Sequence, residues 1–153
     1  MVDLKSNEIT ANREILKKTK VENVFFTWDA LGTQKENVEL VNHGGGFYLA
    51  QVKLNQKSLL EAIKENIDSN NNRPYVVLEE IFKDKKIIRE YYLTNSIQGI
   101  DANIWSGVQS VGKIRKIIIS DGKESIEDHY YIMNFTEKKF IYNIIAKSLV
   151  NRK

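Results

Sequence analysis

Hydrophobic side chains near the start of the chain change from helical spacing to an apolar run. Ile9, Ile15 and Leu16 fall on one side of a helix, which predicts a short helix over residues 7–18. Residues 24–28 (Val-Phe-Phe-Thr-Trp) form a β-branched and aromatic run that is typical of a buried strand. The first two elements are therefore predicted to be a helix and a core strand.

The following segments repeat this order. A second helix is expected over about 31–42, and the run 43–46 (His-Gly-Gly-Gly) is the strongest stop signal in the chain. A strand is expected over 47–53, and apolar residues at helical spacing predict a third helix over 59–67. This part of the chain is thus predicted to alternate helices with strands.

Such alternation implies a parallel sheet whose crossovers are right-handed. We therefore expect strands 24–28 and 47–52 to be adjacent and parallel. Asp29 and Lys53 follow these two strands directly, so they should lie at the same end of the sheet.

The pattern changes after a polar break at 69–74, because strand-like segments then follow one another without helices. Asp121-Gly122 is suited to a tight hairpin turn, since it accepts the positive φ angles that such a turn requires. Antiparallel β structure is the expected result, followed by a terminal helix from about 137. The four predicted strands are 75–82, 86–94, 111–119 and 125–134.

Together these elements predict an α/β fold in a single domain of residues 1–153. We divide it into an α/β portion (1–72), an inserted antiparallel β region (73–135) and a C-terminal helix (136–153). The chain length agrees with one domain, because ~100–200 residues per domain is usual.

Composition narrows the class of protein only a little. The chain has no cysteine, which excludes a disulfide framework and a thiolate metal site, and it has no apolar run of membrane-spanning length. A cytoplasmic protein without a membrane partner is expected. The net charge of +3 comes from 23 basic and 20 acidic residues, so attraction to DNA would need local patches. Lys113, Arg115 and Lys116 are the candidate patch, and an ordinary solvated surface is the alternative.

Asp29 is the first candidate for chemistry, because open α/β sheets bind ligands at the carboxyl ends of their strands. An aspartate there is also a common helix N-cap, and both interpretations stay open. Lys53, Asn55 and Gln56 lie just past the next strand and could contact phosphates or flipped bases, or form a polar turn.

Several aromatic residues could stack on single-stranded bases, but core packing is the simpler interpretation. We interpret His43 and His129 as a helix-end residue and a strand residue. The aromatic candidates are Tyr91, Tyr92, Trp105, Tyr130 and Tyr131.

Residues 27–36 (Thr-Trp-Asp-Ala-Leu-Gly-Thr-Gln-Lys-Glu) carry a family resemblance. They closely resemble the segment around the second catalytic aspartate of the H-repeat-associated insertion-sequence transposases. Further similar segments occur in the same order and extend the resemblance over essentially the whole chain. These segments are 5–10, 45–50, 53–56, 89–92, 105–112, 121–123 and 130–132.

The resemblance implies a ribonuclease-H-like domain of DDE type, in which two aspartates and a glutamate hold Mg²⁺ ions. Asp29 would be a catalytic metal ligand, and DNA would be the partner. Two such ions can activate the attacking oxygen and stabilise the leaving oxygen of a phosphoryl transfer. The first aspartate of the family's trio would precede Met1, and Asn151 would stand at the glutamate position.

We therefore expect an incomplete ribonuclease-H-like core and a transposase-like protein that is catalytically inactive by itself. Its relatives would cleave and transfer DNA strands during transposition. The alternatives are a catalytically dead DNA-binding or subunit-association protein, which could self-associate, and a decayed remnant without a selected role.

Overall fold

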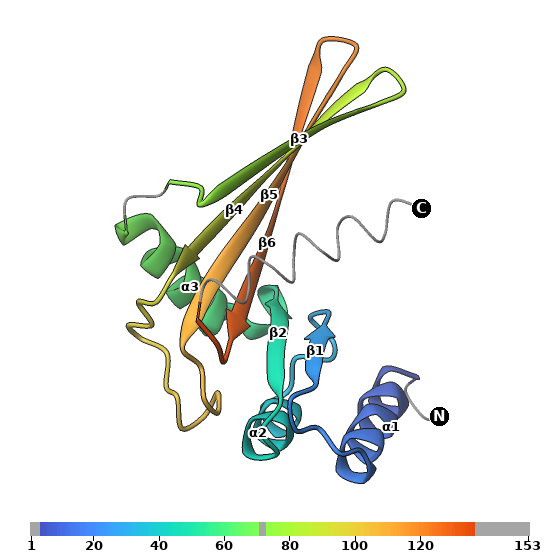
Figure 1. The fold of residues 1–153 in the computed structure, drawn as a ribbon, viewed down its shortest axis with the longest axis vertical. Helices are drawn as coiled ribbons and strands as arrows, with labels where there is room; N and C mark the ends of the chain where they lie inside the picture. Colours follow the sequence, from blue (N-terminus) through green and yellow to red (C-terminus); the bar gives the residue numbers. More distant parts are fainter. Residues whose placement is uncertain (1–3, 71–72, 137–153) are drawn as a thin grey trace.

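The computed structural model describes residues 4–70 and 73–136 and shows one mixed α/β unit (Figure 1). Its helices and strands agree with the predicted order. The predicted terminal helix and Asn151 lie outside the described residues. The elements are α1 (Leu4–Lys18), β1 (Phe25–Trp28), α2 (Lys35–His43), β2 (Phe47–Val52), a 3₁₀ turn η1 (Leu54–Gln56), α3 (Lys57–Ser69), β3 (Val76–Phe82), β4 (Lys85–Thr94), β5 (Ser110–Ser120) and β6 (Lys123–Met133).

The six strands of the described residues belong to one sheet, in the order β1-β2-β6-β5-β4-β3. β1 and β2 are parallel, with Thr27 opposite Leu49, and this confirms the predicted pairing of the first two strands. β6 then lies antiparallel to β2, with Val52 opposite Tyr130, so the predicted antiparallel region continues the same sheet. Asp29 and Lys53 consequently follow neighbouring strands at the same end of the sheet.

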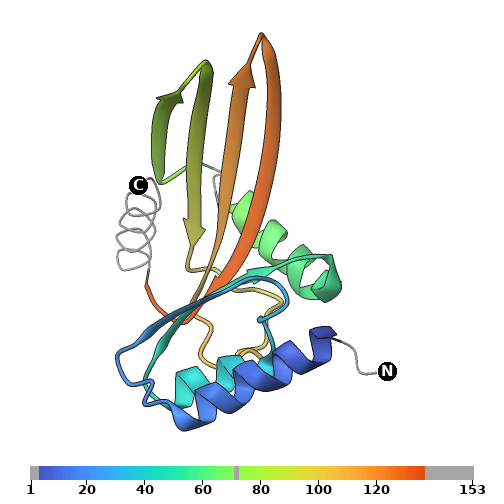
Figure 2. The ribbon, with the colours of Figure 1, turned by 90° about the vertical axis from the view of Figure 1, so that its right-hand side faces the viewer.

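The last four described strands are antiparallel, as predicted, and each pairs with the next along the chain to form a meander. Asp121 and Gly122 have φ angles of 52° and 71° in the turn between β5 and β6, which confirms the hairpin. Because β5 and β6 each have 11 residues, the meander projects well beyond the helices (Figures 1 and 2).

The two faces of the sheet carry separate apolar clusters. The larger one packs α2 and α3 against one face and includes Val41, Ile63 and Ile132. The smaller one lies on the opposite face around Leu49 and Met133. Figure 2 shows α1 beside α2 at the end of the molecule opposite the projecting strands. None of the described helices is long and apolar enough to cross a membrane.

The prediction that 24–28 is a buried strand is wrong. β1 has one neighbouring strand within the described residues, and Phe25, Phe26 and Trp28 are only partly buried. Trp28 still packs on the larger core, where its ring stacks with that of Tyr48 at 6.2 Å between centroids. A strand that is short and apolar can therefore lie at the edge of a sheet as well as in its centre.

The aromatic candidates on β4 and in the loop before β5 are core residues. Tyr91, Tyr92 and Trp105 are 2%, 6% and 6% exposed, which leaves little ring surface for a base to stack on. Tyr130 and Tyr131 are partly buried and pack against the two apolar clusters. Core packing is thus the interpretation that the structure supports.

Candidate functional site

The segment after β1 is a hydrogen-bonded turn, and α2 starts four residues later than predicted, at Lys35. The Asp29 carboxylate accepts a hydrogen bond from the Gly32 N–H at 3.0 Å. The Thr33 hydroxyl donates to the carbonyl of Gln51 at 2.6 Å and thereby ties the turn to β2. These bonds satisfy the backbone in a non-helical conformation, which explains the later helix start.

Asp29 therefore caps a turn, whereas the N-cap residue of α2 is Gln34. The Asp29 side chain is exposed, so capping leaves its carboxylate accessible to a ligand. The interpretation of Asp29 as a helix N-cap is therefore wrong, and its role as a metal ligand stays a prediction.

A cleft of about 630 Å³ opens beside this turn at the carboxyl ends of β1 and β2. The residues after Asp29 form one side of the cleft, and α3 forms another. The end of β2 and the middle of β6 complete it, because these two strands are paired. Ligands of open α/β sheets bind at this position.

Two lysines from different elements line the cleft. Lys53 follows β2, and Lys64 projects from α3 with its Nζ atom 5.3 Å from the centre of the Tyr130 ring. Asn55 also lines the cleft and supplies a polar side chain from η1. Lys53 and Lys64 are both exposed, so the cleft offers two accessible cationic groups.

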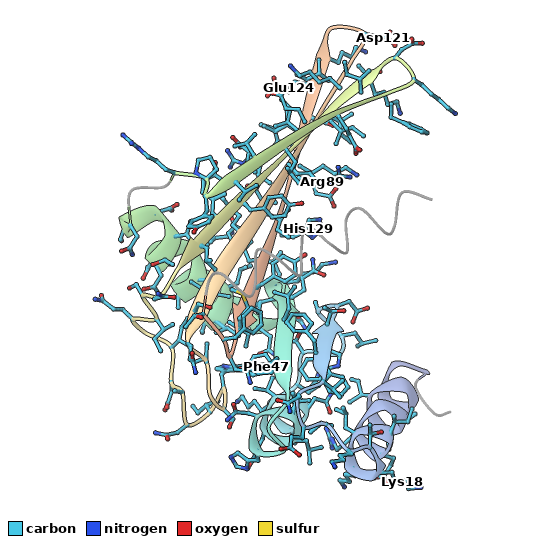
Figure 3. All side chains as sticks on the ribbon, in the orientation of Figure 1. Lys18, Phe47, Arg89, Asp121, Glu124 and His129 are labelled. Atoms are coloured by element: carbon cyan, nitrogen blue, oxygen red, sulfur yellow. The ribbon has the colours of Figure 1, made fainter. Side chains whose placement is uncertain are left out.

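His129 of β6 lines the cleft, and Figure 3 shows it near the end of β2. Its Nδ1 atom accepts a short hydrogen bond from the Gln51 side-chain amide. An Nδ1 atom that accepts leaves the proton of a neutral ring on Nε2, and Nε2 lies 2.9 Å from the Glu127 carboxylate. Gln51 and Glu127 thus fix the orientation and the tautomer of the His129 ring.

Asp128 lines the cleft next to His129, but its carboxylate is already engaged. Arg115 of β5 donates to both oxygens, with Nε–Oδ1 and Nη2–Oδ2 distances of 2.9 and 3.0 Å. These hydrogen bonds hold the pKa of the Asp128 carboxyl below its usual value and raise the pKa of Arg115. A bidentate pair of this kind leaves Arg115 with less capacity for a phosphate.

The three basic residues of β5 do not form one exposed patch. Lys113 is 4% exposed, with its Nζ atom 4.1 Å from the centre of the Tyr92 ring, and burial lowers its pKa. Lys116 points to the opposite face of the sheet from Lys113 and Arg115, because side chains alternate along a strand. Contacts of these residues with DNA remain a prediction, but they would have to be made separately.

The structure thus brings together only some of the predicted site residues. Lys53 and Asn55 line the cleft and Asp29 lies beside it, whereas Gln56 stands outside the lining as the N-cap residue of α3. Lys64 and His129 were missed, because neither had a recognisable motif around it. Only the pairing of β6 with β2 and the packing of α3 bring them to this end of the sheet.

A complete Mg²⁺ site is not formed by the described residues. Within 4–70 and 73–136, no three histidine or carboxylate side chains gather at metal-binding distance. Asp29 offers one carboxylate, whereas a pair of Mg²⁺ ions needs several oxygen ligands. These residues do not fit the pair of ions that the family resemblance implies.

Several curated proteins are similar in sequence to this chain. It is 31% identical over 150 residues to the putative protein YbfL of Escherichia coli K12, covering 90% of this chain and 40% of the relative. It is 30% identical over 150 residues to the H repeat-associated putative transposase YhhI of the same organism, with the same coverage. A 63-residue stretch is 43% identical to the H repeat-associated putative transposase YbfD, covering 41% of this chain and 25% of that protein.

The chain therefore resembles H repeat-associated transposases, as its residues predicted. It spans about 40% of the length of YbfL and YhhI. No family model matches it, and no solved structure matches it.

Proposed function

We propose that this chain is a transposase-like protein of DDE type whose cleft binds the sugar–phosphate backbone of DNA. The observation that carries the proposal is the convergence of Asp29, Lys53 and Lys64 at the carboxyl end of the parallel pair β1–β2. Two of the named relatives, YhhI and YbfD, are described as H repeat-associated putative transposases, and transposases act on DNA.

The chemistry of the cleft suits a phosphate backbone. The cleft lies next to Asp29. It presents the accessible ammonium groups of Lys53 and Lys64 and the side-chain amide of Asn55. Lysine and asparagine side chains are common phosphate contacts, and such contacts position DNA without reading its sequence. We therefore assign the cleft to sequence-tolerant binding.

The parallel pair and its flanking helices support the finer proposal of a ribonuclease-H-like core. In such a core Asp29 would be one of the metal ligands. The described residues supply no second and third carboxylate beside it, so we assign no cleavage step to this chain by itself. Its proposed activity is DNA binding. Strand cleavage and transfer would require a protein that has the complete carboxylate trio.

Site-directed crosslinking tests where DNA lies. The chain has no cysteine, so Asn55→Cys carries a photoactivatable group at the cleft alone. Asn95→Cys is the matched control, because Asn95 is exposed in the loop after β4 and is not among the residues that line the cleft. We expect labelled DNA to crosslink at position 55 and much less at 95. Equal crosslinking at both positions would overturn the assignment of the cleft.

Plasmid nicking tests the second half of the proposal. Incubation of the chain with supercoiled plasmid and Mg²⁺ or Mn²⁺ should leave the plasmid intact. Nicking that disappears in Asp29→Ala would show that the chain has a working catalytic site, and it would refute the proposed inactivity.

A further inference from the structure

The cleft beside Asp29 has an apolar wall that contacts with a phosphate backbone do not explain. Leu31 lines it from the turn after β1, Val52 from β2, Leu60 from α3 and Leu54 from η1. Contacts with phosphates and sugars are made by charged and polar groups. The apolar wall is therefore suited to a part of the ligand that carries no charge.

Leu54 is the residue of this wall that a ligand can reach most easily. It is 76% exposed, whereas Val52 and Leu60 are 1% and 7% exposed. A single exposed leucine is common on protein surfaces, but this one lies in a concave site. Lys53 and Asn55 stand on either side of it in the chain and line the same cleft. A ligand at this point meets an apolar side chain between a cationic group and an amide.

The charges of the cleft restrict where a phosphate can lie. Lys53 and Lys64 are accessible cations, but Glu127 and Asp128 also line the cleft. Arg115 compensates the Asp128 carboxylate, whereas Glu127 accepts a hydrogen bond from the neutral His129 ring and keeps its negative charge. Like charges repel, so a phosphate lies beside the lysines and the rest of the cleft takes an uncharged group.

The size of the cleft agrees with a whole nucleotide. Its volume of about 630 Å³ falls within the ~300–1,000 Å³ of sites that hold complete small molecules. A nucleotide combines one phosphate with an uncharged sugar and base. In a paired duplex the base faces are stacked on one another, and only the base edges reach the grooves. An apolar side chain in a cleft can therefore contact the face of a base only where that base is unpaired.

Tyr130 is the aromatic residue of the cleft, but its ring is already engaged. The Nζ atom of Lys64 lies 5.3 Å from its centre, and the ring packs against the larger apolar cluster. Leu54 has no such cover, as its exposure shows. Among the apolar residues of the cleft, Leu54 is thus the one that is placed to receive a base.

We propose that the cleft binds an unpaired nucleotide of DNA, whose phosphate contacts Lys53 and Lys64 and whose base packs on Leu54. This inference rests on the proposed function, because it requires that DNA lies in the cleft. Sites for single strands combine a cationic groove with side chains on which the base faces pack, and they tolerate many sequences because every base has such a face. The preferred partner is DNA with mismatched or single-stranded positions.

The contact with Leu54 sets the size of the preference. Withdrawal of most of an exposed leucine side chain from water changes an equilibrium constant by about tenfold. In mismatched DNA little pairing energy is lost when the base leaves the stack. Mismatched DNA should therefore bind about tenfold more tightly than paired DNA of the same length.

Competition between two duplexes, followed by fluorescence anisotropy, tests the inference. Both have the same number of phosphates, and one carries three consecutive mismatches at its centre. The ratio of their affinities should be about ten for wild type, should stay near that value for Leu54→Met, and should fall toward one for Leu54→Ala. Ile15→Ala is the matched control with the wild-type ratio, because Ile15 is 61% exposed and lies on α1, outside the lining of the cleft.

Mismatched DNA also bends more easily, which favours it on any surface that deforms DNA. A preference of that origin would persist in Leu54→Ala, so an unchanged ratio in this variant would overturn the inference. A wild-type ratio near one would do the same.

The variant Lys53→Ala/Lys64→Ala separates this inference from the proposed function. It should weaken the binding of both duplexes. If it does so while the wild-type ratio is one, DNA lies in the cleft through its backbone alone and only the inference about the base fails. If it weakens neither duplex, the assignment of the cleft to DNA fails as well.

Discussion

Asn134 is the residue whose replacement should most reduce stability at the end of the sheet beside α2. It follows β6 and is 7% exposed. Its Oδ1 atom accepts from the backbone N–H of Tyr48 at 2.8 Å, and its Nδ2 group donates to the carbonyl of Gly46 at 3.0 Å. The same Nδ2 group lies 3.1 Å from the Asn42 side-chain oxygen. One amide thus connects the end of β6 to the start of β2 and to α2.

Asn134→Ala would leave the Tyr48 N–H and the Gly46 carbonyl without these partners. Both residues are buried. A buried polar group without a partner costs about 1–3 kcal/mol. Water that enters the space left by the side chain would satisfy part of the two groups, so we expect the free energy of unfolding to fall by roughly 3 kcal/mol. For a chain of this size that loss corresponds to a fall in Tm of about 6–12 °C.

Urea denaturation followed by far-UV circular dichroism measures the effect. The midpoint should fall while the slope with urea stays unchanged, because the surface exposed on unfolding is nearly the same. Asn95→Ala is the matched control, because Asn95 is exposed, and it should shift stability by less than about 0.5 kcal/mol. If Asn134→Ala costs less than about 1 kcal/mol, Asn134 does not hold these elements together as reasoned from its buried hydrogen bonds.

Two further predictions concern the ion pair beside the cleft and one glycine. The hydrogen bonds from Arg115 are the chief cause of a lowered pKa of Asp128 in the folded state. The ion pair therefore stabilises the fold at pH values above the ordinary aspartate pKa. This stabilisation is lost as the pH falls through the folded-state pKa. Asp128→Asn should therefore lower stability at pH 7 by about 1 kcal/mol and flatten the acid-side loss in urea melts at several pH values, and an unchanged acid profile would contradict this. Gly107 and Gly122 have φ angles of 74° and 71°, but only at Gly107 would a Cβ atom meet a neighbour, at 2.1 Å from the Asn42 side-chain oxygen. Gly107→Ala should lower Tm clearly more than Gly122→Ala, and equal shifts would mean that backbone strain alone matters there.

The parts of the fold that could be predicted are those that local sequence determines. Asp121-Gly122 specifies its hairpin because two adjacent residues accept positive φ. The parallel pair of 24–28 and 47–52 follows from a strand–helix–strand order, which permits few arrangements. The edge position of β1 could not be predicted, since it depends on the order of strands across the sheet.

The residues of the cleft also divide into those that local sequence predicts and those that it does not. Lys53 and Asn55 could be found because residues just after a strand lie at the ligand-binding end of the sheet. Lys64 and His129 come from a helix and an antiparallel strand, and only tertiary packing brings them to that end. Lys113 was expected to be exposed, but the sheet buries it against the Tyr92 ring.

The salt dependence of DNA binding tests the central claim most directly. Fluorescence anisotropy of a labelled duplex gives the slope of log affinity against log salt for wild type and for Lys53→Ala/Lys64→Ala. Each lysine that neutralises one phosphate contributes about 0.9 to that slope, so the cleft variant should lose about 1.8 in magnitude.

Lys18→Ala/Lys20→Ala is the control with the same loss of charge, and Figure 3 shows Lys18 far from His129 of the cleft. Lys18 and Lys20 are exposed, so their loss should leave the slope close to that of wild type. A cleft variant with the wild-type slope, or a control that flattens the slope equally, would contradict the assignment of the cleft to DNA.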